Sequence, residues 1–292
     1  IADRSTKGIG RAFYTAAESL GCVPRLFLIK KMKHNGQEPP AEVARAMLKA
    51  DIVMMPTSTS LSHTLARKKA CEAGARIASM PRITEAMIRR TLTVDFGAMH
   101  KRCKRLISQI RDARKVRVVT DAGTDITFDL TGRKLHGDHE ADYRKPGQWG
   151  NLPAGEVFFS PVEGMTEGVF VIDTANPVTL QLLKKPIKVE VCNGYAVSIT
   201  NGKDADIFAR YLERLKDRKA YNVAELGIGC NEKARITGNI LEDEKVMGTA
   251  HIALGDNFSM GGKVISETHM DCVFRKPTVW AGRRKIIDQG DF

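Results

Sequence analysis

The first 115 residues alternate short apolar runs with stretches of helical periodicity. Runs of apolar and β-branched residues at 25–29, 51–55 and 75–79 have the length and composition of buried strands. Helical patterns stand between them, bounded by proline, glycine or capping hydroxyl residues. Because strands that alternate with helices form parallel sheets with helices packed on their faces, we predict an α/β N-terminal domain with a parallel sheet over residues 1–115.

Strand patterns predominate after residue 115. Residues 115–120 and 126–130 flank a turn, and the second run alternates apolar with polar side chains, which indicates a hairpin. Further strand patterns lie at 168–173, 187–191 and 195–199, and a helical pattern lies at 205–215. We therefore predict that residues 116–292 form a β-rich α+β C-terminal domain.

The net charge of +12 is concentrated in the predicted N-terminal domain. Residues 1–115 contain 23 Lys and Arg against 9 Asp and Glu, whereas the rest of the chain has 23 against 25. The densest basic run, residues 100–105, continues into Leu106, Ile107 and Ile110 at helical spacing, which indicates an amphipathic helix with a solvated basic face. No aromatic residues interleave with these charges to stack on bases, so a nucleic-acid partner is not predicted.

Several other classes of protein are excluded by simple patterns. No apolar run approaches the roughly 20 residues that a membrane span needs. The first residues lack the apolar core of a signal peptide, and the six cysteines are widely spaced without a C-x-x-C pair. We therefore expect a cytoplasmic protein with reduced thiols. Residues 8–10 are only a G-x-G, so we predict a strand-to-helix turn there and no nucleotide site.

Residues 268–272, Thr-His-Met-Asp-Cys, contain the clearest signal for chemistry. On a strand, residues i and i+2 point to the same face, so His269 and Asp271 are predicted to converge. His251 lies in another apolar segment, residues 248–255, which is bounded by glycines. As neighbouring strands, the two segments would present two imidazoles and a carboxylate, a donor set that suits a divalent metal ion.

Two carboxylates, Glu156 and Glu225, stand among apolar and glycine residues. A charge in such surroundings is costly unless it is paired or coordinates a cation. Residues 242–245, Glu-Asp-Glu-Lys, are predicted to form a solvated loop or helix end. The predicted metal ligands are Glu156, Glu225, His251, His269 and Asp271, and no further catalytic residue is assigned.

Five motifs resemble, in the same order, those of the thermophilic metalloaminopeptidase family that includes aminopeptidase T, aminopeptidase S and PepS. They are residues 151–158, 224–229, 243–245, 248–255 and 268–271. The resemblance is close over the C-terminal half. Over the N-terminal half it is looser and consists mainly of residues 51–67 and the α/β layout. It implies a homodimer and a pair of divalent metal ions, zinc, cobalt or manganese, held by two Glu, two His, one Asp and one Tyr.

The five predicted ligands match five of these six positions. The family tyrosine lies seven residues after the first His, and here that position is Phe258, whose phenyl ring cannot coordinate a metal. The segment between His251 and His269 is also shorter than in the peptidases. Both differences weaken the resemblance in activity more than the prediction of a metal site.

The principal hypothesis is a metal-dependent aminopeptidase of the leucyl aminopeptidase kind, a hydrolase that releases N-terminal residues from peptides. Two metal ions would share Glu225 or Asp271, activate a water and polarise the peptide carbonyl. Glu156 would bind metal or help to transfer protons.

Two alternatives remain open at this point. The first is a mononuclear iron(II) oxygenase acting on a small molecule, since two His and one carboxylate form the facial triad of non-haem iron enzymes. A ring-cleaving 2,5-dihydroxypyridine dioxygenase is similar in sequence to the peptidase family, and the loss of the tyrosine fits one metal better than two. The second is a non-catalytic homologue whose basic N-terminal domain binds an acidic partner or an anionic ligand.

Overall fold

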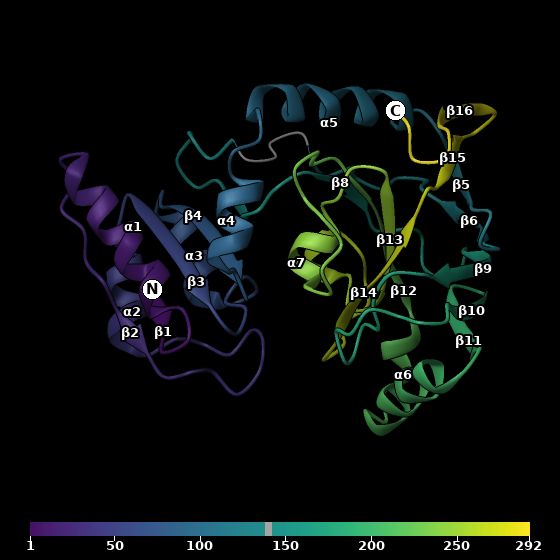
Figure 1. Cartoon of the computed structure of the whole chain (residues 1–292), viewed down its shortest axis with the longest axis horizontal. Coiled ribbons are helices and arrows are strands. Elements are labelled where there is room, and N and C mark those ends of the chain that lie inside the picture. The colour runs from purple at the N-terminus through teal and green to yellow at the C-terminus, as the bar shows by residue number, and fades with distance from the viewer. Residues whose placement is uncertain (138–141) are drawn as a thin grey trace. The chain divides into compact units, whose positions relative to one another are not determined.

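The computed structural model describes residues 1–137 and 142–292 (Figure 1). These residues divide into two compact units. The first contains Ile1–Phe96 and residues 142–154, and the second contains residues 97–137 and Gly155–Phe292. The predicted domain boundary at residue 115 stays a prediction, and each unit is described by itself.

The first unit is a parallel α/β structure. Strand β1 pairs with β2, and β3 pairs with β4, which pairs with β7, all in parallel. Its elements are β1 (Ala2–Asp3), α1 (Lys7–Ser19), β2 (Leu28–Ile29), α2 (Ala41–Met47), β3 (Ile52–Thr57), α3 (Leu65–Glu72), β4 (Arg76–Pro81), α4 (Glu85–Thr91) and β7 (Trp149–Asn151). Strands and helices alternate along the chain, which is the order that the sequence indicates.

An apolar cluster of this unit lies on one face of the β3–β4–β7 sheet. Val53 and Met55 of β3 and Ile77 of β4 are buried there. They pack in one apolar cluster with Val43 and Met47 of α2. Burial of each side chain of this size contributes about 1.5–3 kcal/mol, so this cluster stabilises the packing of α2 on the sheet.

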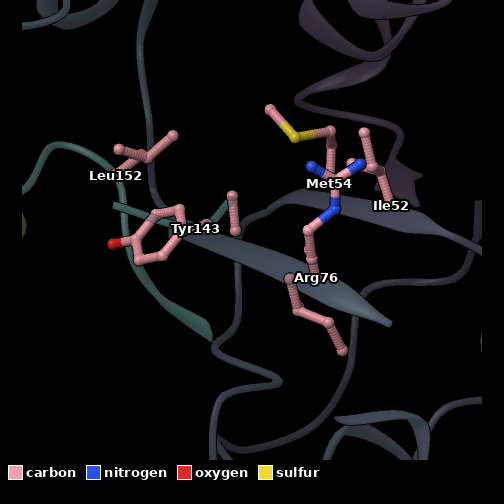
Figure 2. Close-up of a pocket in the computed structure, with 7 residues that line it drawn as sticks. Ile52, Met54, Arg76, Tyr143 and Leu152 are labelled. Carbon is pink, nitrogen blue, oxygen red and sulfur yellow. The ribbon is translucent and has the colours of Figure 1, made fainter. Parts of the chain in front are cut away.

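The opposite face of the same sheet bears a small apolar pocket. Ile52 and Met54 point away from the core, because alternate residues of a strand face opposite sides. With Arg76, Tyr143 and Leu152 they line a pocket of about 170 Å³ (Figure 2). Its lining contains neither a carboxylate nor an imidazole, so it offers no metal ligands of the predicted kind.

The second unit contains two antiparallel sheets. One has seven strands in the order β11-β10-β9-β6-β5-β15-β16, and the other has four in the order β14-β13-β12-β8. The strands are β5 (Lys115–Val119), β6 (Asp125–Asp129), β8 (Glu156–Phe159), β9 (Glu167–Ile172), β10 (Ile187–Cys192), β11 (Tyr195–Thr200), β12 (Val223–Gly229), β13 (Thr249–Gly255), β14 (His269–Arg275), β15 (Thr278–Ala281) and β16 (Arg284–Ile287). The helices are α5 (Phe96–Ile110), α6 (Lys203–Arg214), η1 (Arg218–Tyr221), α7 (Ile240–Asp243) and η2 (Phe258–Met260).

Helix α5 contains the basic run of the sequence. Its apolar side chains, such as Cys103, Leu106 and Ile110, are buried, and its basic side chains Lys104 and Arg105 are exposed. The predicted amphipathic helix is therefore confirmed. Strands β5 and β6 pair antiparallel, as the predicted hairpin requires.

The chain is thus a mixed α/β protein with both parallel and antiparallel sheets. Among the described residues, every helix is too short or too polar to cross a membrane.

Candidate metal centre

The four-stranded sheet carries all five predicted metal ligands. They are Glu156 on β8, Glu225 on β12, His251 on β13, and His269 and Asp271 on β14. All seven residues of β12 and of β13 are buried, so two of these side chains are placed in the interior by strands whose remaining residues are apolar, glycine or threonine.

The register of the sheet brings three of these side chains to one face. Glu225 pairs with Ala253, and Ala253 pairs with Asp271, so the two carboxylates lie in one row with the small side chain of Ala253 between them. Directly opposite residues of antiparallel strands have their side chains on the same face. His251 pairs with Gly227 two residues further along, so the imidazole joins that face.

The remaining two ligands follow from the same register. Glu156 is opposite Gly229 on β12, and His269 is opposite Gly255 on β13. Each predicted ligand therefore has a glycine or alanine as a cross-strand neighbour on its own face. The small neighbours leave this face of the sheet free for the five polar side chains.

The glycine at 227 is required by a close approach. A Cβ atom built there would lie 2.1 Å from both Cε1 and Nε2 of His251, so the imidazole occupies the space of the missing side chain. A Cβ atom at Gly229 would lie 2.0 Å from the carbonyl oxygen of Val246, so this glycine admits the backbone that follows Lys245. Both positions exclude any larger residue unless the site moves.

The five side chains form two groups that share Glu225. In the first, Nε2 of His251 lies 3.3 Å from Oε1 of Glu225 and 3.7 Å from Oε2 of Glu156. In the second, Nε2 of His269 lies 3.2 Å from Oε2 of Glu225 and 3.4 Å from Oδ1 of Asp271. Each residue offers a ligand atom within 4.8 Å of the others in its group, which is close enough to surround a metal ion.

The centre is most exposed on the side of β14. Glu156, Glu225 and His251 are buried, whereas 31% of the His269 side chain is exposed. The Nδ1 atom of His269 lies 2.8 Å from the carbonyl oxygen of Asp256, which can only accept a hydrogen bond. The hydrogen therefore sits on Nδ1, and Nε2 is turned towards the carboxylates, as in metal-ligating histidines generally.

Two residues of the centre were missed by the sequence analysis. Glu244 and Lys245 were predicted to be solvated, but they are only 8% and 1% exposed. The Nζ atom of Lys245 forms ion pairs with Glu156 and, at 2.6 Å, with Oε1 of Glu244. Glu244 also hydrogen bonds to Asp271.

The prediction of a solvated segment is wrong because the chain itself satisfies these charges. The carboxylate of Asp243 accepts hydrogen bonds from the backbone N–H groups of Thr237 and Gly238, and Glu242 accepts one from that of Arg235. Four consecutive charged residues have no periodicity that separates this arrangement from a solvated turn. The pattern therefore gave no signal for it.

The two histidines lower the pKa values of the carboxylates that they contact. Burial raises the pKa of Glu225, but hydrogen bonds with His251 and His269 outweigh it and lower that pKa to about 2. Asp271 behaves in the same way, with its pKa held below the usual range mainly by His269. Burial raises the pKa of Glu244 to about 8, and the charges of Asp271 and Glu156 act in the same direction against the opposing effect of Lys245.

The carboxylates in turn raise the pKa values of both histidines. Burial alone would lower the pKa of His251, but Glu225 outweighs it and raises that pKa to about 9. Asp271 and Glu225 likewise raise the pKa of His269 well above its ordinary value. Both shifts have one cause, which is the concentration of negative charge in a buried place.

A divalent cation fits this centre. It would supply the positive charge that otherwise comes from protons on the two imidazoles. The Oε2 atom of Glu156 is buried and accepts no hydrogen bond from the residues that the structure describes, and it is available as a ligand. Imidazole and carboxylate donors together suit zinc, iron, manganese or cobalt.

Phe258 has no part in this ligand set. It lies in η2 and is 61% exposed. The position of the family tyrosine is thus occupied by a side chain that offers no donor atom.

Comparison with known proteins identifies the family. The model of the 2,5-dihydroxypyridine 5,6-dioxygenase family, NicX, matches residues 10–292. The chain belongs to the NicX family. A curated relative, 2,5-dihydroxypyridine 5,6-dioxygenase of Pseudomonas putida KT2440, is 24% identical over 258 residues, which cover 85% of this chain and 72% of the relative.

Two solved structures share the fold. The structure of 2,5-dihydroxypyridine dioxygenase from Pseudomonas putida KT2440 superposes with a TM-score of 0.79 at 20% identity, over 95% of this chain and 85% of that one. Wild-type AmpT from Thermus thermophilus superposes with a TM-score of 0.72 at 17% identity, over 100% and 92%. The resemblance to the aminopeptidases is therefore a relationship of fold.

The principal functional hypothesis is corrected by these findings. The chain belongs to a family of dioxygenases, so its assignment as an aminopeptidase, a hydrolase and a metalloprotease is wrong. The error has a chemical reason, because imidazole and carboxylate ligands serve hydrolytic zinc and oxygen-activating iron alike. Phe258, which removes a ligand from the peptidase set, was the residue that pointed to the alternative.

Proposed function

We propose that this chain is a non-haem iron(II) dioxygenase that opens the ring of a dihydroxypyridine. The family match over residues 10–292 carries the proposal. The donor set supports it, since two imidazoles and a carboxylate are the ligands of mononuclear iron oxygenases. In this chain they lie on one face of a sheet.

His251, His269, Asp271 and Glu225 would hold the iron, and Glu156 lies in the group of His251 and Glu225. Glu225 contacts both imidazoles, one through each oxygen, so it joins the two groups into one centre. A bound iron(II) would supply the redox chemistry by which molecular oxygen attacks the ring.

Neighbouring residues hold the carboxylates of this centre in position. Lys245 keeps the Glu156 carboxylate in place through an ion pair. Glu244 accepts a hydrogen bond from Nζ of Lys245 and hydrogen bonds to Asp271, which holds that carboxyl group in place. The partly exposed edge at His269 is where the substrate would enter.

Elemental analysis and oxygen uptake test the proposal together. Protein purified without chelator or histidine tag should bind about one iron per chain and consume oxygen with iron(II) and 2,5-dihydroxypyridine. Peptides should not be hydrolysed. Full metal loading without oxygen uptake on any of a panel of hydroxylated pyridines would contradict the proposal. The homodimer that the resemblance implies stays a prediction, which light scattering would check.

A further inference from the structure

The loop between β13 and β14 comprises residues 256–268. It begins with Asp256, whose carbonyl oxygen orients His269. A Cβ atom at Gly255, where φ is +116°, would lie 2.0 Å from the carbonyl oxygen of Thr268, so the two ends of the loop are in contact. The backbone N–H of Asp256 donates to that oxygen at 2.7 Å. The carbonyl of Asp256 then faces Nδ1 of His269. A movement of the loop that reaches Asp256 would therefore move the acceptor of this histidine.

Arg133 fastens the middle of the loop from outside. Its side chain is only 10% exposed. Nη1 donates to the carbonyl oxygen of Gly261 at 2.6 Å, and Nη2 forms an ion pair with Glu163. A guanidinium can contact two acceptors at fixed geometry, so one side chain joins the loop to the segment after β8.

Glu163 extends the attachment to both sides of η2. Its Oε1 atom accepts hydrogen bonds from Nδ2 of Asn257 at 3.1 Å and from the backbone N–H of Lys263 at 2.8 Å. Asn257 is fully buried, and its Oδ1 atom accepts from the N–H of Val264 at 2.9 Å. The loop is thus held from residue 257 to residue 264 by one carboxylate and its partners.

A second contact ties the same segment to the strand of Glu156. His136 exchanges backbone hydrogen bonds with Phe158 of β8 and stacks on its ring, with centroids 4.9 Å apart. Nε2 of His136 lies 3.3 Å from the carbonyl oxygen of Met260. Residues 133–136 therefore bridge β8 and the loop.

We infer that Arg133 is a positioning residue of the metal centre. By holding the loop against Glu163, it fixes the carbonyl of Asp256 on Nδ1 of His269, so that Nε2 stays directed at Glu225 and Asp271. The acceptor on the second ring nitrogen sets both the orientation and the basicity of a ligating histidine. The role of the centre in metal binding rests on the proposed function, but the positioning of His269 is measurable without metal.

The test compares Arg133→Met, Arg133→Lys and the control Arg117→Met. Arg117 also forms two contacts, both with Asp125 at 2.7 Å, on the exposed β5–β6 hairpin. In metal-free protein, imidazole-detected NMR should show a protected Nδ1–H of His269 in the wild type and the control. Arg133→Met should exchange that hydrogen at least tenfold faster. Its affinity for manganese or iron(II), measured by calorimetry, should fall about 10- to 100-fold, the range for outer partners of metal ligands.

Arg133→Lys should give intermediate values, because an ammonium keeps the pair with Glu163 and loses the second contact. Exchange of the His269 Nδ1–H at the wild-type rate in Arg133→Met would overturn the inference. If Arg133→Met does not fold, wild-type exchange and affinity in Arg133→Lys would overturn it. A wild type that binds no metal, with fast exchange in Arg133→Met, would refute the proposed function and leave the positioning role intact.

Discussion

The imidazole of His251 lies across Gly227 of the neighbouring strand, where a Cβ atom would come within 2.1 Å of its Nε2 atom. The glycine is therefore part of the candidate metal centre although it offers no ligand atom. Its effect is steric, since it allows the ring to lie against β12 with Nε2 next to Glu225.

Replacement of this glycine should disturb the centre without removing a ligand. Gly227→Ala should displace His251, weaken metal binding and lower stability by about 1–3 kcal/mol, the usual cost of overpacking. Gly8→Ala is the control, because Gly8 lies in α1 and a Cβ there meets only a carboxylate oxygen of Glu85 at 4.0 Å. Metal titration and thermal unfolding measure both effects. Unchanged metal affinity in Gly227→Ala would show that the ring has room to move.

Glu225 should matter more for metal binding than Glu156. Its two oxygens contact both histidines, whereas Glu156 belongs to one group only. We expect Glu225→Gln to weaken binding by more than the roughly 10–100-fold typical of outer partners, and Glu156→Gln to have a smaller effect. Calorimetric titration ranks the variants, with exposed Glu213→Gln as control. The reverse ranking would place the ion away from Glu225.

Metal binding should release protons at neutral pH. In the metal-free chain the pKa of His251 is about 9 and that of His269 is well above its ordinary value, so both imidazoles are charged at pH 7. A histidine must lose its extra proton before it can bind a metal, so apparent affinity should rise with pH until about pH 9. Calorimetry in buffers of different ionisation enthalpy counts the protons. A pH-independent affinity between pH 6 and 9 would exclude histidine ligation.

Stability should depend on pH in the metal-free protein. The folded-state pKa of His251 lies above the ordinary histidine value of 6.5, so its protonation stabilises the folded state fully below pH 6.5. That stabilisation is lost as the pH rises to about 9. Urea unfolding of metal-free protein should therefore show decreasing stability over this range, and bound metal should remove the decrease. A rise in stability over the same interval would mean that the carboxylates do not govern this histidine.

Lys245 should be needed for stability as well as for the site. Lys245→Met leaves Glu156 and Glu244 buried without their cation, which costs about 3–5 kcal/mol when a buried pair is broken. The double variant Glu244→Gln with Lys245→Met should recover part of the loss. Lys188→Met, which breaks the half-exposed pair with Glu190, should change the unfolding free energy by about 1 kcal/mol or less. Equal effects at 188 and 245 would contradict a buried ion pair.

Strand periodicity was sufficient to find most of the candidate centre. His269 and Asp271 at i and i+2 were predicted to share a face, and the structure pairs their strand with that of His251. Glu156 and Glu225 were selected because a charge among apolar residues needs a partner, and both lie in the cluster. Their role as ligands stays a prediction.

The sequence does not predict contacts that depend on backbone groups or on the register of the strands. The burial of Glu244 and Lys245 depends on N–H groups that enclose the preceding carboxylates, and no residue pattern encodes that enclosure. Gly227 lies in the motif 224–229, but its position opposite His251 follows only from the strand pairing. The reaction class was mispredicted because the same five side chains suit two chemistries.

The path of the chain between its two units has a consequence for synthesis on the ribosome. The parallel sheet of the first unit is completed by β7, which pairs with β4 through Ile77 and Trp149. Helix α5 and the β5–β6 hairpin, which belong to the second unit, are made before β7. During synthesis, the edge of β4 in the N-terminal sheet therefore stays unpaired while part of the second unit is made. A gene fragment that stops at residue 115 would carry that unpaired edge permanently, and such edges invite aggregation.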